Sequence, residues 1–367
     1  MYILKKKIMW QAHESISSGA NIAMLEYMDA LTDSFIFFVI LPHKGNMQQL
    51  LEQRDIPYTI IHQYGWTNFF SWWNIGKFMK LLLRSIAAIW QTTLLLKKEK
   101  PSIICTNTIV PFTASIAAKF KRIPHVWWIH EFGKEDFGFT TGWGYEKISF
   151  WWMQKSSNLI IGNSEAISAK FRNIMSKTVI ETVYQPVSWK STSVRTSENA
   201  PVFFMFGQLV ESKGHKDVLQ AMISNLQQGK RLHRLDIIGP SEIEDYLIEL
   251  HNIVHQNNLH QYVKIKVGFF DKEEIMPNYD VLIVASKAEA FGRVIVEANK
   301  AGLRVLVRNC GGSPELVNET NGLLYENQNE LSAILCGEIK FPDKVMRFNY
   351  DEDSEIIKLT TLLTRLC

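Results

Sequence analysis

Two glutamates, Glu289 and Glu297, stand with seven residues between them in the stretch AEAFGRVIVEANKAG, which runs from Ala288 to Gly302. At about 100° per residue, eight steps on one helix would leave the two carboxylates roughly 80° apart and more than two turns from each other. That separation is too large for a carboxylate pair that shares one proton. A helix that begins after Phe291-Gly292 would instead leave Glu289 in the entry loop and Glu297 inside the helix.

Such a helix start could bind a ligand that carries both an anion and hydroxyl groups. The backbone N–H groups of Gly292, Arg293 and Val294 would lie in its first turn, where unpaired donors and the helix dipole attract anions. Ionised carboxylates only accept hydrogen bonds, which suits sugar hydroxyls at Glu289 and a ribose diol at Glu297. The plain alternative makes Glu297 a solvated helix residue and Glu289 a loop acid favoured by the dipole.

A second motif, GQLVESKGHKDVLQA, begins at Gly207. A strand ends in glycine, a loop carries Lys213 and Gly214, and a helix follows. Glycine permits close backbone approach to a ligand, and a lysine beside it supplies a point charge suited to phosphate. An ordinary strand-to-helix turn with a solvated lysine would look the same in sequence.

Three weaker motifs also follow expected strands. Gly311-Gly312 in RNCGGSPELV precedes Pro314 and Glu315, which indicates a helix start or only a tight turn. Gly19 in ESISSGAN is a weak signal for a phosphate-binding loop. His130, followed by Glu131 in WWIHEFG, could be a hydrogen-bond donor, a general base or a structural histidine.

The elements that must position these residues form two consecutive α/β units. Apolar runs such as KIMWQ, FIFFVIL, YTIIH, SIICTN, HVWWIH and NLIIGNS alternate with helix-like stretches, which predicts a parallel sheet covered on both faces. The polar stretch from Val187 to Pro201 reads as a connection, and strands VFFMFG, RLDIIG, VKIKVGF, VLIVAS and RVLVRN follow it. We expect domains over 1–187 and 188–345, with a C-terminal helix over 346–367 that packs back on the N-terminal domain. The segment PELVN is expected to begin a further helix. Ligands of open α/β sheets bind at the carboxyl ends of strands, where all these motifs sit.

Composition limits the function classes. Hydrophobic residues make up 46% and charged residues 21% of the 367-residue chain, an ordinary globular balance. The net charge of +3 is too small to indicate a nucleic-acid binder. Four scattered cysteines without a Cys-x-x-Cys pair indicate neither a zinc site nor a disulfide framework, and reduced thiols fit a cytoplasmic protein. The apolar run after the N-terminal lysines is too short for a signal peptide.

The most hydrophobic window runs from Phe78 to Lys100. Lys80 and Arg84 interrupt it, which argues against a transmembrane span. The overlapping segment FFSWWNIGKFMKLLLRSIAAIWQ, Phe69 to Gln91, mixes aromatic, aliphatic and basic residues, as a segment bound at a membrane headgroup interface does. A helix pair with a buried aromatic face is the alternative.

Taken in order, these motifs resemble the GT-B-fold retaining glycosyltransferases of family four. EAFGRVIVEANKAG resembles the glutamate-seven-glutamate motif of that family. Other motifs of the family occur in the same order along this chain: Gly19, IHE at 129–131, IGNSEAIS at 161–168, GQLVESKG at 207–214, NCGGSPELV at 309–317 and NGLLY at 321–325. The resemblance implies an α/β fold of two Rossmann-like domains facing across a central cleft. The C-terminal domain would bind a nucleotide-diphosphate sugar, and the N-terminal domain would bind the acceptor.

The resemblance also assigns roles. Lys213 would bind the diphosphate, Glu297 the ribose, and Glu289 with the backbone from Phe291 to Val294 the transferred sugar and its phosphate. Gly19 and Gly207 would lie beside the donor, and His130 near the reacting face of the sugar. Glu289, His130 and Lys213 would thus form the catalytic set. The family has no carboxylate nucleophile, so the acceptor is thought to attack on the face that the diphosphate leaves.

Two positions depart from the family. Gln208 stands where the family usually has an arginine, the second cation for the diphosphate, so Lys213 acts with less help or Arg293 compensates. Ser18-Gly19 stands where two glycines are common.

The resemblance implies a metal-independent hexosyltransferase of bacterial surface polysaccharide synthesis. It would act on a glycan or lipid-linked acceptor at the cytoplasmic face of the membrane, with the nucleotide sugar as substrate, no cofactor and no nucleic-acid partner. A nucleotide-sugar epimerase of related architecture and a binding-only partner protein, the latter prompted by Gln208, are the alternatives. The stretch DED at Asp351 to Asp353 formally matches an Asp-x-Asp metal signature, but it lies before the last expected helix rather than at a strand end.

Overall fold

The computed structural model describes residues 5–63, 65–66, 75–138, 146–190, 201–342 and 351–367. The chain divides into two compact units, which are described separately. Unit 1 comprises Met1–Pro186 together with Asp351–Cys367, and unit 2 comprises Val187–Tyr350. Most of the polar connection that the sequence indicates (191–200) and the aromatic residues 69–74 lie outside the described residues.

Unit 1 is built on a parallel sheet of seven strands in the order β3-β2-β1-β4-β5-β6-β7. Its strands are β1 (Lys6–Gln11), β2 (Phe35–Leu41), β3 (Tyr58–Ile60), β4 (Ile103–Asn107), β5 (His125–Ile129), β6 (Leu159–Gly162) and β7 (Ile180–Thr182). Most are continuous apolar runs because both faces of a parallel sheet are covered. The sequence did not predict β7, which has only three residues, one of them Glu181.

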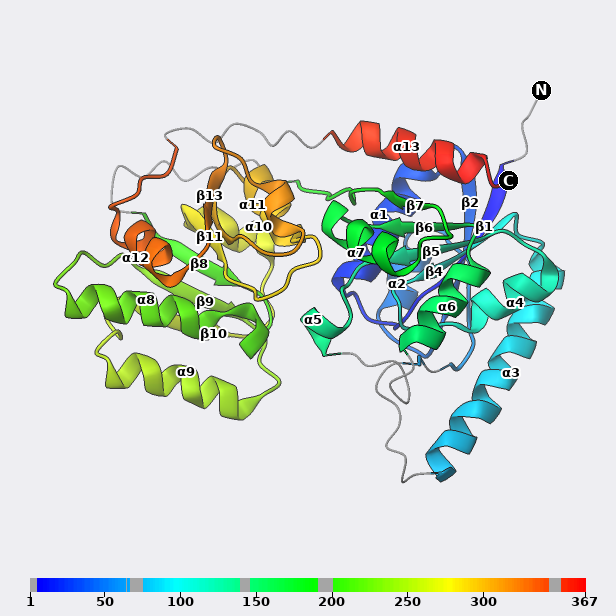
Figure 1. Cartoon of the computed structure of the whole chain (residues 1–367), viewed down its shortest axis with the longest axis horizontal. Helices are drawn as coiled ribbons and strands as arrows, with labels where there is room; N and C mark the ends of the chain where they lie inside the picture. Colours follow the sequence, from blue (N-terminus) through cyan, green and yellow to red (C-terminus); the bar gives the residue numbers. More distant parts are fainter. Residues whose placement is uncertain (1–4, 64, 67–74, 139–145, 191–200, 343–350) are drawn as a thin grey trace. The chain divides into compact units, whose positions relative to one another are not determined.

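Helices cover both faces of this sheet (Figure 1). They are α1 (Gly19–Leu31), α2 (Met47–Glu52), α3 (Ile75–Glu99), α4 (Thr113–Lys121), α5 (Lys134–Phe137), α6 (Glu146–Ser156), α7 (Glu165–Ile174) and α13 (Glu352–Thr364). Alternate residues of β1 face different layers: Ile8 and Trp10 pack with α1 and α13, whereas Met9 packs with residues of α3 and α4. On the first face, Trp10 stacks on Trp128 with ring centroids 5.3 Å apart.

The C-terminal helix α13 belongs to unit 1 although it follows all of unit 2 in the chain. Leu359 and Leu363 are fully buried in the core that also contains α1. Glu355 accepts a hydrogen bond from the backbone N–H of Tyr184 (3.0 Å), and Lys358 donates to the carbonyl of Thr182 (2.6 Å). Apolar burial and these two bonds attach the helix to the end of β7.

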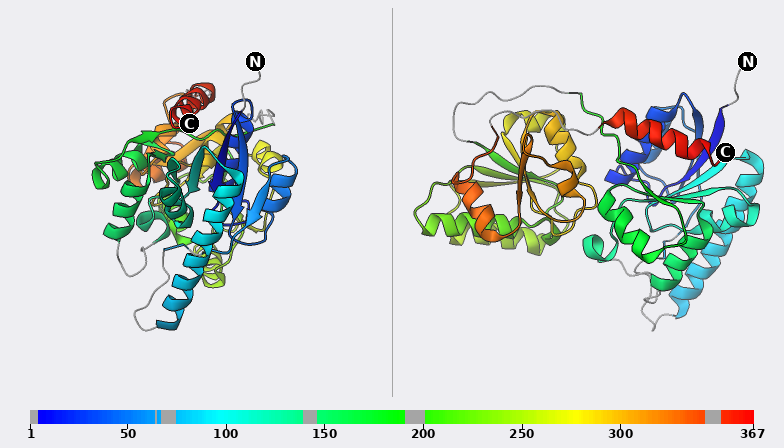
Figure 2. Two further views of the ribbon diagram at one scale, coloured as in Figure 1. Left: turned by 90° about the vertical axis from the view of Figure 1, so that its right-hand side faces the viewer. Right: turned by 45° about the horizontal axis from the view of Figure 1, so that its top comes forward.

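Unit 2 has a parallel sheet of six strands in the order β10-β9-β8-β11-β12-β13. The strands are β8 (Phe203–Phe206), β9 (Leu235–Gly239), β10 (Val263–Val267), β11 (Val281–Val284), β12 (Arg304–Arg308) and β13 (Gly322–Tyr325). The helices are α8 (His215–Gln227), α9 (Glu244–Gln256), α10 (Lys272–Ile275), α11 (Arg293–Lys300) and α12 (Gln328–Cys336), and they again cover both faces (Figure 2). The expected α/β class with two Rossmann-like domains is confirmed.

The segment PELVN does not begin an α-helix as expected. Residues Ser313–Leu316 form a single 3-10 turn, and the chain then enters β13. The side chain of Asn321 donates to the carbonyl of Leu316 (3.0 Å), and the carboxamide oxygen of Asn318 accepts from the N–H of Thr320 (2.8 Å). Asparagine side chains that bond to nearby backbone compete with helix continuation, which explains the early end.

Candidate functional site

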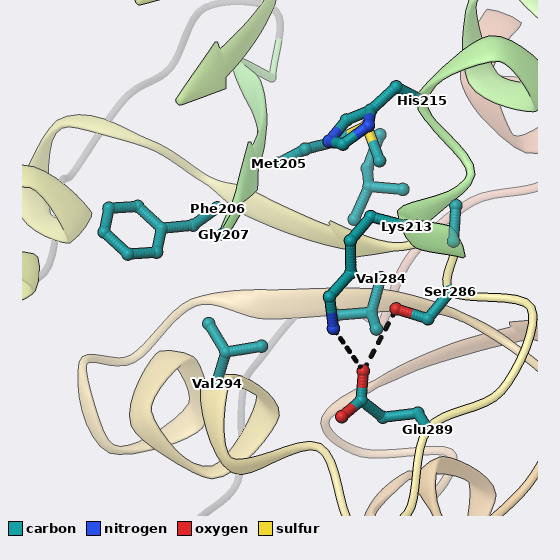
Figure 3. A pocket seen from close by; sticks show the side chains of 11 residues that line it. Met205, Phe206, Gly207, Lys213, His215, Val284, Ser286, Glu289 and Val294 are labelled. Carbon is teal, nitrogen blue, oxygen red and sulfur yellow. Dashed lines mark hydrogen bonds and ion pairs between the residues drawn. The ribbon is translucent and has the colours of Figure 1, made fainter. Parts of the chain in front are cut away.

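The order in which the chain adds strands to the sheet of unit 2 reverses between the two central strands, β8 and β11. Strands β9 and β10 lie on one side of β8, and β12 and β13 lie on the other side of β11. Such a switch point leaves room for a ligand outside the carboxyl ends of the two central strands. A small pocket lies there, and Figure 3 shows side chains from both strand ends around it. Its lining residues are Met205, Phe206, Gly207, Lys213, His215, Ile283, Val284, Ala285, Ser286, Glu289 and Val294.

Lys213 and Glu289 meet at this pocket from different loops. The Lys213 Nζ lies 2.9 Å from Oε2 of Glu289, and the hydroxyl of Ser286 donates to the same oxygen at 3.0 Å (Figure 3). The two side chains are 37% and 20% exposed. Lys213 is therefore ion-paired, unlike the solvated lysine of the alternative interpretation, and it remains accessible to an incoming anion.

Two glycines fix the loops that carry this pair. Gly214 has φ +72°, and a Cβ on it would lie 2.1 Å from the carbonyl oxygen of Ala285, at the end of β11. Gly311 has φ +62°, and its Cβ would lie 2.3 Å from the carbonyl oxygen of Glu289. That carbonyl also accepts a hydrogen bond from the N–H of Gly312 (2.8 Å). Gly311-Gly312 is thus a tight turn that holds the Glu289 loop, since any larger residue would push the two backbones apart.

Glu297 is buried inside α11 rather than solvated. It is 4% exposed, and its carboxylate accepts hydrogen bonds from Nζ of Lys272 (2.7 and 2.8 Å) and from Nε of Arg293 (3.0 Å). Carboxylates are seldom buried without such partners. The alternative of a solvated helix residue is therefore wrong for Glu297.

The sequence did not single out Lys272. It opens the short helix α10 after β10, in the acidic stretch FFDKEE, where a lone lysine has no recognisable spacing. Arg293, by contrast, lies four residues before Glu297 on one helix, a spacing that predicts an ion pair.

His215 is a second residue that the sequence did not indicate. It opens α8, is 2% exposed, and its Nδ1 lies 3.2 Å from the hydroxyl of Tyr246. Burial, helped by the charge of Lys213, lowers the pKa of His215 to about 4, so the ring is neutral near neutral pH. The only sequence signal was its position directly after Lys213-Gly214.

His130 lies in unit 1, directly after β5, and stacks on Trp128. Burial and the nearby His13 lower the pKa of His130 to about 3. Glu131 is also buried; it accepts hydrogen bonds from the N–H groups of Ile109 (2.6 Å) and His130 (3.1 Å). Burial raises the pKa of Glu131 to about 8, so this carboxyl is mostly protonated near pH 7 and holds the backbone around His130.

Gly19 is the first residue of α1, also in unit 1. A Cβ on Gly19 would meet no atom within 4 Å, and its φ is not in the left-handed region. The fold itself therefore does not require glycine here, and the backbone at the start of α1 is open to approach.

Two family profiles match consecutive parts of the chain. The profile described as Glycosyltransferase Family 4 matches residues 45–188, and the one described as Glycosyl transferases group 1 matches residues 190–334. The chain belongs to the GT-B glycosyltransferases of family four. The second profile covers the Lys213, Glu289 and Glu297 positions described above.

Individual relatives match only part of the chain. A glycogen synthase of a Marinomonas species is 32% identical over 134 residues, which is 35% of this chain and 27% of that protein. Spore coat protein SA of Bacillus subtilis is 27% identical over 189 residues, 44% of this chain and 48% of that protein. The matched segment thus spans about a quarter to a half of these relatives.

Solved structures of GT-B proteins resemble the whole chain. The HepE protein of Anabaena, in complex with UDP and glucose, has a TM-score of 0.72 at 20% identity, covering 98% of this chain and all of that one. A glycosyltransferase of Rickettsia africae has a TM-score of 0.78 at 16% identity, covering 99% and 98%. At such identities the likeness concerns the fold.

The remaining family positions lie at the same strand ends. Gly207 directly follows β8 and has φ +146°, and Gln208 beside it is exposed. Phe291 is buried, and Gly292 caps α11 with φ +91°. Arg293, named as a replacement for the missing arginine at Gln208, pairs with Glu297 instead. Its charge is therefore shared with a carboxylate rather than held alone for a diphosphate.

The acidic stretch Asp351 to Asp353 forms the N-cap and the first residues of α13. The carboxylate of Asp351 caps this helix by accepting a hydrogen bond from the N–H of Ser354 (3.3 Å). Among the residues that the structure describes, no three His, Cys, Asp or Glu side chains are grouped so that they could hold a metal ion.

Proposed function

We propose that the protein is a retaining, metal-independent glycosyltransferase that takes a sugar from a nucleotide-diphosphate sugar. The observation that carries the proposal is a pair of carboxylates at one end of the unit 2 sheet, each held by a lysine from another element. Glu289 is paired with Lys213, and Glu297 with Lys272 and Arg293. Together they offer acceptors for hydroxyl groups and positive charge for phosphates within one site.

The first turn of α11 separates the two carboxylates and suits the diphosphate. Its N–H groups, at Val294 for example, carry the positive end of the helix dipole, and Lys213 adds a full charge at the neighbouring loop. As the sugar–phosphate bond breaks, negative charge grows on the departing diphosphate. A lysine held beside the site by the Gly214 turn stabilises that charge once it turns to the diphosphate.

The carboxylates take the hydroxyl groups at either side. Glu297, buried and immobile, accepts from the ribose diol, while Glu289 keeps its bond from Ser286 and accepts from the transferred sugar once Lys213 turns to the diphosphate. Neither is offered as a nucleophile, since Glu297 holds two cations and Glu289 is proposed to bind hydroxyl groups of the transferred sugar. This favours attack by the acceptor on the face that the diphosphate leaves.

Donor and acceptor classes are part of the proposal. The complexes of the Anabaena protein with UDP and glucose and with UDP-glucose support a uridine nucleotide sugar as the first donor to try. We propose a glycan or lipid-linked acceptor of bacterial surface polysaccharide synthesis, bound by unit 1 at the cytoplasmic face of the membrane.

The test is donor turnover with matched lysine variants. UDP-, GDP- and ADP-sugars are first screened by thermal shift, because binding stabilises the fold by mass action. Release of nucleoside diphosphate is then measured for the wild type, Lys213→Met and Lys216→Met. Lys216 lies in the same segment and is paired with Glu249 at 3.0 Å, so it controls for loss of a paired lysine.

We expect Lys213→Met to lose about 100-fold or more in kcat/KM, while Lys216→Met stays within about twofold. The configuration at the transferred carbon, read by NMR, should be that of the donor. Equal turnover in Lys213→Met would contradict the site. Nucleotide binding without turnover of any sugar would instead favour the binding-only partner that Gln208 suggests.

A further inference from the structure

Helix α3 is a long, apolar and largely exposed helix of unit 1. Among the described residues it alone is long and apolar enough to cross a membrane, over Met79–Glu99, and only 22% of its most apolar window is buried. Its N-terminal half extends beyond the sheet and the other helices of the unit (Figures 1 and 2). A core helix of this composition would be mostly buried.

One face of α3 accounts for its attachment to the unit. Ser85, Ala88, Thr92 and Leu96 recur at three- or four-residue spacing and are at most 5% exposed. Ala88 and Leu96 belong to the core cluster that contains residues of α4. This narrow face suffices to hold the helix on the unit.

The opposite face is also apolar and faces solvent. Leu83 and Trp90 are each 62% exposed, and Ile86 is 54% exposed. Met79, Leu82 and Leu94 belong to the same set, with 40–48% exposed. The expectation of a buried aromatic face is therefore wrong for Trp90. Single exposed apolar residues are ordinary, but a continuous stripe along one helix marks an interaction surface.

The charges around the stripe have one sign. From Ile75 to Lys98 the helix carries five lysines or arginines and no acidic residue. Lys97 lies roughly 20° and Lys80 roughly 80° around the helix from Trp90. Glu99, the first acid, is paired with Lys7 at 2.9 Å. A second copy of this chain would bring the same cations together, whereas an anionic surface complements them.

We propose that the exposed stripe of α3 binds an anionic phospholipid surface, with the helix lying in the plane of the interface. Leu83, Ile86 and Trp90 enter the headgroup region, and Lys80 and Lys97 contact lipid phosphates. The helix lies along the surface rather than across the membrane because its other face packs on the unit. Charges at Lys80 and Arg84 would also be costly inside the bilayer. The proposal adds a lipid-binding surface to the membrane location given in the proposed function, and it holds whatever sugar is transferred.

The test is flotation of the full chain with vesicles of phosphatidylcholine, alone or mixed with phosphatidylglycerol. We expect binding to the mixed vesicles at low salt and weaker binding at high salt, where charges are screened. Leu83→Glu with Trp90→Glu should lose at least about tenfold in partitioning. Lys80→Gln with Lys97→Gln should lose roughly 25-fold at low salt, since each cation near an anionic surface contributes about fivefold.

A matched control is Ile248→Glu on α9, where an apolar residue of unit 2 is 49% exposed and a charge should not change partitioning. Thermal unfolding of each variant checks that it folds. Three results would overturn the proposal. The first is no flotation of the wild type at low salt. The second is a dimer by light scattering that Trp90→Glu dissociates, which would assign the stripe to a second copy. The third is that only detergent, and not high salt, releases the protein from the vesicles, which would indicate a helix that spans the membrane.

Discussion

The ion pair between Lys272 and Glu297 gives a prediction whose size follows from the structure. The Nζ lies 2.7 and 2.8 Å from the two carboxylate oxygens, and the side chains are 36% and 5% exposed. Breaking a fully buried pair costs about 3–5 kcal/mol. Because Lys272 is partly solvated and Arg293 remains on Glu297, we expect Lys272→Met to cost about 1–2 kcal/mol.

Glu297→Gln should cost more, about 2–3 kcal/mol, because it leaves two cations without their anion. The double variant Lys272→Met with Glu297→Gln should lose about 1–2 kcal/mol less stability than the sum of the two single losses. This difference is the coupling free energy of the pair. In a unit of this size, about 1 kcal/mol corresponds to 2–4 °C in Tm. The assay is thermal unfolding of the full chain with and without a nucleoside diphosphate.

A second ion pair of unit 2 serves as the control. Lys266, 39% exposed, lies 2.7 Å from the fully buried Asp236, which also keeps an arginine, Arg234. Lys266→Met and Asp236→Asn should therefore lose comparable stability. Only Glu297→Gln should lose the Tm shift on adding nucleotide, since the carboxylate is proposed to bind the ribose. A coupling below about 0.5 kcal/mol, or an undiminished nucleotide shift in Glu297→Gln, would refute the reasoning.

Two further predictions concern other positions. Gln208→Arg should raise donor affinity roughly five- to thirty-fold at low salt, since a charge ~5 Å from a diphosphate contributes about 1–2 kcal/mol when largely solvated. Calorimetry with Gln208→Met as control measures this, and an unchanged affinity would place the diphosphate elsewhere. Glu131, whose pKa is raised from 4.5 to about 8, contributes stability that is complete below about pH 4.5 and lost as pH rises through 8. The lowered pKa values of His130 and His215 change stability only below pH 6.5. The Tm of the wild type should therefore fall between pH 6.5 and 8, while the Tm of Glu131→Gln should change less over the same range. Parallel curves of Tm against pH for the two proteins would exclude this role of Glu131.

Local pattern in the sequence was enough for the elements and for the loops that carry the site. Strands such as β2 and helices such as α8 have a clear hydrophobic period, and each motif falls where such a strand ends. Glycines at Gly207, Gly214 and Gly292 indicated tight backbone because only glycine adopts their φ without strain. The short β7 and the 3-10 turn at Pro314 were not predicted, because neighbouring strands and local asparagine bonds decide them.

The pairing of side chains depended on the tertiary structure. Lys213 and Glu289 are 76 residues apart and Lys272 and Glu297 are 25 apart, so no local period connects them. They meet because parallel strands bring their carboxyl ends to one edge of a sheet. The exposure of the α3 stripe was equally undecided, since an apolar helix face looks the same in sequence whether protein or solvent covers it. The sequence by itself determined where the loops lie and which residues of their motifs could do chemistry, but it did not indicate Lys272 or His215. Only the tertiary structure decided which charges neutralise each other and which apolar face is left uncovered, because both depend on packing between distant segments.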